Sequence, residues 1–236
     1  MKSIKSLALL TGLLALSGVS QAQFSSTWTA VSDYDFRGFS QSAKGPALQG
    51  SADYAFGESG FAVGAWASNV DFNDPDEGWV SDADIELDVY AGYTGEINDT
   101  FSWTGGFVYY TYPGADLAED FAEFYVGLNA GNFGIKQWYT NDLYGSSVDA
   151  LYTEANYTQP LGDKFSLAFH LGYAYGDGWD EIETTDYAVQ LNYTAGNFTI
   201  FGKFTGTDGD AEIDTDVNNN EPRFLIGAST TFPWGN

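Results

Sequence analysis

The chain has 236 residues, of which 33 are acidic and 8 are basic, so its formal net charge is −25. Such an excess of acid repels nucleic acids and anionic lipid surfaces and attracts cations. The absence of cysteine excludes a disulfide framework and a thiolate metal site. Hydrophobic residues make up 44% of the chain and aromatic residues 17%, a composition that favours a folded protein over a disordered acidic chain.

The N-terminal segment has the pattern of a bacterial secretory signal. Two lysines precede a mostly apolar run over residues 7–16, and small and polar residues follow up to Ala22. We expect cleavage after Ala22, because the apolar run is too short to span a membrane comfortably. Residues 1–22 are then a signal peptide and residues 23–236 a single domain. Cleavage leaves 6 basic and 33 acidic residues, a formal charge of −27.

Within this domain, apolar and polar residues alternate over stretches of about ten residues. In the clearest stretch, residues 84–93, Ile85, Leu87 and Val89 share one face, and mostly acidic residues occupy the other. Alternation with this period predicts β-strands that have one apolar and one polar face. We predict twelve strands, at residues 24–37, 46–56, 61–71, 84–93, 101–112, 120–130, 133–141, 149–159, 164–175, 186–194, 198–206 and 223–232.

Short turns and longer loops alternate between the predicted strands. The connections after even-numbered strands are short, and those after odd-numbered strands are longer and mostly acidic, as in residues 74–82 and 177–183. This pattern is typical of an all-β transmembrane barrel, antiparallel and up-and-down, with short periplasmic turns and longer acidic extracellular loops. Either Phe232 is the functional end of the last strand or residues 233–236 are a short periplasmic extension.

The alternative fold is a secreted soluble β-sandwich, in which the apolar faces form a core. Sandwich cores favour Val, Ile and Leu, whereas the apolar faces here are rich in Tyr, Trp and Phe near strand ends. Aromatic residues at those positions are typical of the interfacial girdles of a membrane barrel. The barrel interpretation places the apolar faces against lipid and the polar faces in the lumen.

Several longer motifs resemble those of a known bacterial family. They are SDYDFRGFSQS at 32–42, PALQG at 46–50, GAWASNVD at 64–71, ELDVYAGY at 86–93, YTYPG at 110–114 and EFYVG at 123–127. Together they resemble the TorF-like putative porin family of proteobacteria, and the similarity spans most of the mature chain. The resemblance implies an outer-membrane location and a porin-like barrel. It carries over no catalytic motif.

The alternation assigns a charged set of side chains to the lumen. The acidic members are Asp33, Asp35, Asp53, Asp84, Glu86, Asp88, Glu123 and Glu154; the basic members are Arg37, Lys203, Arg223 and, less clearly, Lys136. One interpretation is a net-acidic pore lined by these residues that favours cations or zwitterions. The other is a network of carboxylates, bases and tyrosines that plugs a narrow barrel.

Neither a metal site nor a catalytic site is predicted. Alternating acids at residues 208–216 superficially resemble a calcium-binding loop, but Ile213 replaces the turn glycine and Asn219 the bidentate glutamate. A solvated acidic loop, or one that associates loosely with divalent cations, fits better. His170 is the only histidine and shares the polar face of its strand with Ser166, but no nucleophile motif accompanies it. We therefore expect a protein that is not an enzyme and has no cofactor.

Two functions fit these observations. The first is an outer-membrane, porin-like channel for small polar solutes that prefers cations. The second is a non-conducting structural or interaction barrel whose acidic loops bind cations, lipopolysaccharide or a partner. The expected partners are outer-membrane lipid, lipopolysaccharide, the barrel-assembly machinery and small solutes or cations, without nucleic acid.

Overall fold

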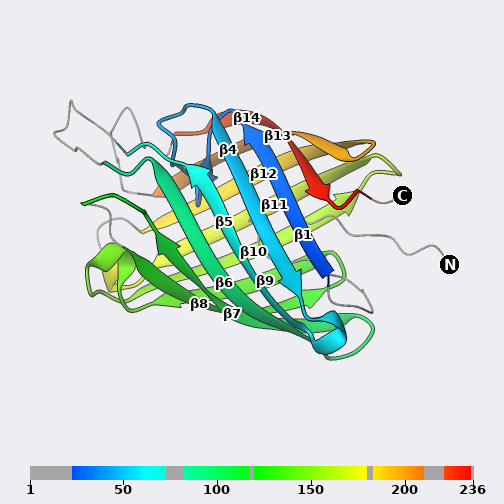
Figure 1. The fold of residues 1–236 in the computed structure, drawn as a ribbon, viewed down its shortest axis with the longest axis horizontal. Helices are drawn as coiled ribbons and strands as arrows, with labels where there is room; N and C mark the ends of the chain where they lie inside the picture. The colour runs from blue at the N-terminus through cyan, green and yellow to red at the C-terminus, as the bar shows by residue number, and fades with distance from the viewer. Residues whose placement is uncertain (1–22, 73–81, 117–119, 180–182, 210–220, 235–236) are drawn as a thin grey trace.

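The computed structural model describes residues 23–72, 82–116, 120–179, 183–209 and 221–234. Twelve strands close into one antiparallel barrel (Figure 1). They are β1 (Gln23–Val31), β4 (Ala47–Ala55), β5 (Phe61–Asn69), β6 (Ile85–Glu96), β7 (Phe101–Thr111), β8 (Phe121–Ala130), β9 (Phe133–Thr140), β10 (Ala150–Pro160), β11 (Phe165–Tyr175), β12 (Thr184–Ala195), β13 (Phe198–Gly209) and β14 (Arg223–Phe232).

Pairing of the first and last strands closes the barrel. β1 pairs with β14, where Ser26 lies opposite Phe232, and with β4 on its other side. Every other barrel strand pairs with the strands before and after it. Closure gives each strand two hydrogen-bonded neighbours, so the barrel has no open edge. The predicted fold, an antiparallel barrel of about twelve strands, is confirmed.

Alternation along the strands separates an apolar outside from a polar and aromatic inside. On β8, Phe124, Val126 and Leu128 are exposed on the outer surface, whereas the alternating residues Glu123 and Tyr125 are buried. β6 shows the same pattern over almost its whole length. The buried aromatic residues of the interior join into two hydrophobic clusters. The barrel therefore has a largely filled interior and an apolar belt outside.

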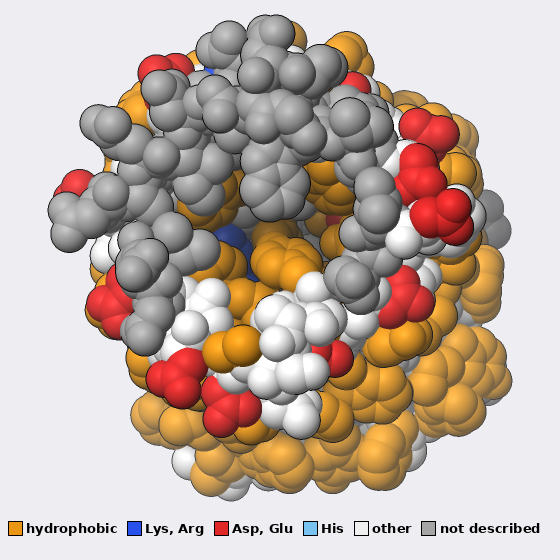
Figure 2. Space-filling model, turned by 90° about the vertical axis from the view of Figure 1, so that its left-hand side faces the viewer, with side chains coloured by type: hydrophobic (Ala, Val, Ile, Leu, Met, Phe, Trp, Pro, Cys, Tyr) orange, Lys and Arg blue, Asp and Glu red, His pale blue; other side chains and the backbone are white. Residues whose placement is uncertain are grey.

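The two ends of the barrel differ. At one end, short turns join each even-numbered predicted strand to the next strand, and one of these turns contains η1 (Gly57–Ser59). The described chain also begins and ends near this end of the barrel. The longer connections lie at the opposite end, with η2 (Leu143–Gly145) and η3 (Asp177–Trp179). Figure 2 views the end with the longer connections and shows acidic side chains around its rim and a hydrophobic-lined recess in the middle.

The predicted first strand, residues 24–37, is wrong in its second half. β1 ends at Val31, and β2 (Asp35–Phe36) and β3 (Phe39–Ser40) form a separate two-stranded sheet. The alternating pattern continues past Val31 because this hairpin is itself extended. Arg37 and Gly38 turn the chain with φ values of 50° and 87°, as a tight two-residue hairpin turn requires. At Gly38 a Cβ would collide with Thr207 of β13.

Most other strand boundaries lie within two residues of the prediction, and β6 and β13 extend three residues further at their C-terminal ends. Asp84 precedes β6 and is exposed, so it does not lie on the lumen wall as expected. The expected signal peptide (1–22) and most of the acidic loops (73–81, 180–182, 210–220) lie outside the described residues. Within the described part of the chain, no helix is long and apolar enough to cross a membrane.

Candidate functional site

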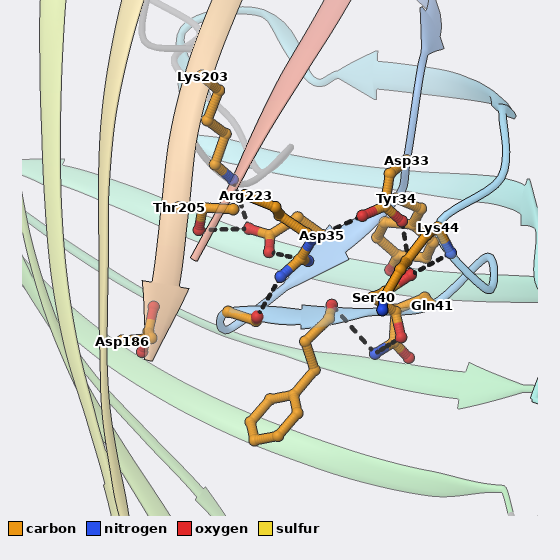
Figure 3. A network of polar contacts seen from close by, with 12 residues as sticks. Asp33, Tyr34, Asp35, Ser40, Gln41, Lys44, Asp186, Lys203, Thr205 and Arg223 are labelled. Atoms are coloured by element: carbon orange, nitrogen blue, oxygen red, sulfur yellow. Dashed lines mark hydrogen bonds and ion pairs between the residues drawn. The ribbon is translucent and has the colours of Figure 1, made fainter. Parts of the chain in front are cut away.

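The loop after β1 folds into the lumen as a hairpin, residues 33–42, here called the inner hairpin. Its first half is bound to the wall formed by β13 and β14 (Figure 3). Arg223 places Nε 2.6 Å from Asp33 Oδ2 and Nη2 2.5 Å from Asp35 Oδ1. Lys203 Nζ lies 2.6 Å from the second oxygen of Asp35. Arg223 also donates to the carbonyl of Gly38 at 2.6 Å.

The surroundings of Asp35 favour the ionised form of its carboxyl group. Burial raises the pKa of its carboxyl, but the adjacent Lys203 and Arg223 outweigh that effect and hold the pKa below its usual value. Thr205 Oγ1 also donates to Asp35 at 3.1 Å. Ionised carboxylates with two bases and a hydroxyl donor make strong, charge-assisted hydrogen bonds. This contact therefore fixes the base of the inner hairpin to the wall.

The tip of the inner hairpin is bound to a different strand. Arg37 makes a bidentate pair with Glu123 of β8, with N–O distances of 2.9 and 2.6 Å. Its guanidinium carbon lies 4.0 Å from the ring centroid of Tyr152, and Tyr110 also donates to Glu123 at 3.0 Å. Burial alone would lower the pKa of Arg37, but the Glu123 carboxylate more than offsets this effect, so the pKa lies above its usual value. Arg37 is therefore held charged despite its strained positive φ.

These two contacts lie on opposite sides of the barrel. β14 and β8 are six places apart in a ring of twelve strands, so they face each other across the lumen. The inner hairpin therefore spans the lumen between them. Strands β4 to β7 lie on one side of it, and β9 to β12 on the other.

On the β9 to β12 side, each carboxylate has a nitrogen of a lysine or histidine side chain close to it. We call Lys136, Glu154, His170 and Asp186 the balanced wall. Glu154 accepts a hydrogen bond from Trp138 Nε1 at 2.9 Å and lies 3.7 Å from both Lys136 and His170. His170 Nε2 lies 2.7 Å from Asp186, which also accepts from the Tyr152 hydroxyl at 2.9 Å. Each buried carboxylate of this wall has several partners.

On the β4 to β7 side, carboxylates occur without bases. We call Asp53, Glu86 and Asp88 the acidic wall. Asp53 accepts from the Tyr90 hydroxyl and from Ser51, and Glu86 accepts from the Tyr34 hydroxyl at 3.2 Å. Asp88 Oδ1 is buried without a hydrogen-bond partner. Within the described residues, no basic side chain forms an ion pair with any of the three.

The structure brings most of the predicted lumen residues together. Those on barrel strands with inward side chains are Asp53, Glu86, Asp88, Glu123, Glu154, Lys203 and Arg223. Asp33, Asp35 and Arg37 also lie in the lumen, where they pair with residues of the barrel strands, but they belong to the inner hairpin and not to a barrel strand. Only Asp84 of the set is exposed outside a strand. Their role in lining a conducting pathway stays a prediction.

Asp186 is a lumen residue that was not predicted, and Lys136 was the least clear of the predicted lumen bases. Both follow from signals that were present. Tyr187, Val189 and Leu191 alternate along the predicted strand 186–194 and share its apolar face, which leaves Asp186 on the polar face. Lys136 lies directly opposite Glu154 in the β9–β10 ladder. That register was needed to pair them.

A closed twelve-stranded barrel with an apolar exterior and a charged interior defines the porin-like class of folds. The chain belongs to a bacterial protein family of unknown function, Gcw_chp, whose profile matches residues 15–232. The more specific TorF-like assignment is not confirmed by this match. No curated protein matches the chain.

Solved structures of outer-membrane porins and channels have the same fold. KdgM porin is similar with a TM-score of 0.57 at 13% identity, over 88% of this chain and 99% of that chain. NanC porin gives a TM-score of 0.55 at 14% identity, over 88% and 99%. An outer-membrane channel from Pseudomonas putida F1 gives 0.52 at 12% identity, over 91% and 95%. At such identities the likeness establishes the fold alone.

Proposed function

We propose that the protein is an outer-membrane, porin-like channel for small polar solutes that prefers cations. The observation that carries this proposal is the charge of the lumen inside an apolar exterior. In the described residues, the inner hairpin and the walls hold eight carboxylates against four basic side chains. All four bases already pair with carboxylates. Three of the four excess carboxylates lie on the acidic wall, and the fourth is Asp186, which contacts His170. A passing cation therefore meets an uncompensated field on the acidic wall.

The solute class differs from that suggested by one structural neighbour. KdgM porin is known in complex with disordered oligogalacturonate, which is a polyanion. A lumen in which carboxylates outnumber bases two to one repels such a chain, because like charges in a poorly hydrated passage interact more strongly than in bulk water. The proposed solutes are therefore small cations and neutral or zwitterionic molecules.

Planar bilayers test this proposal directly. Purified, refolded protein is expected to give discrete conductance steps, and a KCl gradient is expected to give a reversal potential of the sign that cation preference produces. Complete absence of steps from a heat-modifiable, folded barrel would overturn the channel proposal. Anion preference in a conducting barrel would overturn the selectivity and leave the channel itself intact.

A non-conducting structural or interaction barrel is the second candidate, and two observations favour it. The inner hairpin and the aromatic clusters fill much of the lumen. At the end with the longer connections, outward tyrosines donate hydrogen bonds to rim carboxylates. The pairs are Tyr109 to Asp120 at 3.3 Å, Tyr139 to Asp149 at 3.1 Å and Tyr173 to Glu183 at 2.7 Å.

Such an acidic rim at the level of the lipid headgroups suits divalent cations that bridge to lipopolysaccharide phosphates. Chelator is then expected to lower the melting temperature of the barrel in lipopolysaccharide-containing membranes but not in neutral detergent. Conductance separates the two candidates, since a bridging barrel needs no open lumen. An unchanged melting temperature with chelator would remove the support for this second candidate.

A further inference from the structure

Asp88 is the buried carboxylate that the network leaves out. It is the fourth residue of β6, which begins at Ile85 at the end with the longer connections. Three residues of strand place it roughly 10 Å below that rim. Its side chain points inward and is only 7% exposed, and Oδ1 has no hydrogen-bond partner. A buried, unpartnered carboxylate is costly unless a proton or a cation accompanies it.

Among the described residues, no basic group acts on Asp88 to supply the missing charge. The charged groups that act on it are Glu86 and Glu123, both of its own sign. Glu123 is already neutralised by Arg37. The other titratable groups that face Asp88 are the hydroxyls of Tyr34, Tyr90, Tyr110 and Tyr112. The first three of these donate to other carboxylates, namely Glu86, Asp53 and Glu123 respectively.

Aromatic rings flank Asp88 on both sides. In the sheet its direct neighbours are Trp66 of β5 and Tyr110 of β7. The ring of Tyr34 lies 5.3 Å from the ring of Trp66, and the ring of Phe36 lies 6.1 Å from that of Tyr110. The inner hairpin therefore adds two further rings above this position. Asp88 is therefore an uncompensated carboxylate surrounded by aromatic side chains.

This chemistry favours one class of cation. A divalent metal needs several oxygen ligands in a compact shell, and the described residues contain no cluster of three acidic or histidine side chains that could hold a metal. Alkali cations keep their hydration and gain little from aromatic rings. An organic ammonium ion is weakly hydrated, is attracted to the faces of Trp and Tyr, and can pair with a single carboxylate.

We infer that Asp88, flanked by Trp66 and Tyr110, is a binding site for an organic ammonium ion that enters from the end with the longer connections. The inference rests on the proposed channel function for the route by which the ion arrives. It narrows the solute class from cations in general to amines and methylated ammonium compounds. Trp66 and Tyr110, the latter stacked on Phe121 with ring centroids 4.6 Å apart, provide the aromatic surface, and Asp88 provides the counter-charge.

Calorimetric titration of the folded protein in detergent tests the site, with tetramethylammonium chloride as the probe and sodium chloride at the same ionic strength as the reference. The parent is expected to bind tetramethylammonium saturably and sodium not. Asp88→Asn and Trp66→Leu are each expected to weaken binding by at least about tenfold, since each removes a desolvated attraction. Asp84→Asn removes the same charge from the exposed end of the same segment and is expected to leave binding unchanged.

Each outcome decides the matter. Absence of saturable binding to the parent, equal binding by Asp88→Asn, or equal binding of sodium overturns the inference. If Asp88 only holds a proton, the first of these results is obtained. Asn is isosteric with Asp and removes an unpaired charge, so the variant is expected to fold; the comparison of the two salts on the parent needs no variant at all. Binding without conductance would overturn the proposed channel and keep the site, whereas conductance without binding would overturn only the site.

Discussion

The acidic wall and the balanced wall are built alike but differ in what lies opposite each carboxylate. On the balanced wall, Glu154 has Lys136 as its direct neighbour on the adjacent strand. On the acidic wall, the corresponding neighbours of Asp88 are Trp66 and Tyr110. Because aromatic residues stand beside Asp88 where a lysine stands beside Glu154, the negative charge of the acidic wall is uncompensated. In the proposed channel, the balanced wall would serve the stability of the barrel, and the acidic wall would act on the solute.

The inner hairpin lies between the two walls, because it is bound to β14 on one side of the lumen and to β8 on the other. Its ion pairs join it to the barrel strands: Asp33 and Asp35 pair with Arg223 and Lys203, and Arg37 pairs with Glu123. If the lumen conducts as proposed, a solute on the acidic side would meet carboxylates that pair with no base among the described residues. The comparison is best tested by releasing the inner hairpin first and then by changing each wall alone.

The largest effect is expected from Arg223→Met. This change leaves Asp33 without its base and removes one of the two bases of Asp35, so both carboxylates are driven toward water. Breaking a buried ion pair from one side costs about 3–5 kcal/mol. We expect the inner hairpin to leave the lumen, single-channel conductance to rise several-fold, and the melting temperature in detergent to fall.

Lys44→Met is the matched control for that experiment. Lys44 lies just beyond the inner hairpin and is exposed, and its loss is the same change of charge and side-chain type. Conductance and melting temperature are expected to match those of the parent. Equal effects of both variants, or no effect of Arg223→Met, would contradict the assignment of Arg223 as the anchor of the inner hairpin.

The next prediction compares the two walls by the stability change that follows loss of one carboxylate. This change is expected to have opposite signs on the two walls. Asp186→Asn weakens the contact with His170 Nε2 and is expected to destabilise the barrel by about 1–3 kcal/mol. Asp88→Asn removes a buried charge without a partner and is expected to stabilise it by a similar amount. Urea or thermal unfolding in detergent measures both. Losses of stability in both variants would show that Asp88 has a partner in solution.

Changing the acidic wall alone is expected to alter selectivity more than stability. Glu86→Gln with Asp88→Asn removes two carboxylates and is expected to lower cation preference, measured as a smaller reversal potential across a KCl gradient. The rim pair Asp82→Asn with Asp84→Asn is the control, because both residues are exposed. Rim charges are screened beyond about 8 Å at physiological salt, so the control should matter only at low ionic strength. An unchanged reversal potential in the lumen variant would contradict the role of the acidic wall.

Alternation predicted the barrel and most of the lumen set because a strand period of two assigns faces without tertiary information. Glu86, Asp88 and Glu123 were placed inward on that basis, as the structure has them. The inner hairpin was not predicted, because residues 33–36 continue the alternation of β1 although the chain has left the barrel wall. Gly38 is the one local signal of this turn in the sequence. In the structure, both Arg37 and Gly38 have a positive φ.

The pairing of charges was beyond the sequence for a different reason. Which carboxylate meets which base depends on register and on contacts across the lumen, such as Arg37 with Glu123. These residues are 86 positions apart in the chain, and no periodicity links them. The contrast between the two walls therefore required the structure.

The smallest effect near neutrality is expected from pH, through Asp35 in the inner hairpin. Its pKa is lower in the folded protein than in the unfolded chain, because Lys203 and Arg223 outweigh the effect of burial. A depressed pKa contributes stability that is complete above the unfolded value, about 3.9, and is lost as the pH falls through the lower folded value. Conductance is therefore expected to stay constant from pH 7 to pH 5 and to rise only at still more acid pH, as the inner hairpin loosens. Asp35→Asn should abolish most of that acid-dependent rise, since the titrating group is gone. A conductance change already present between pH 7 and pH 5 would assign the control of the inner hairpin to another group.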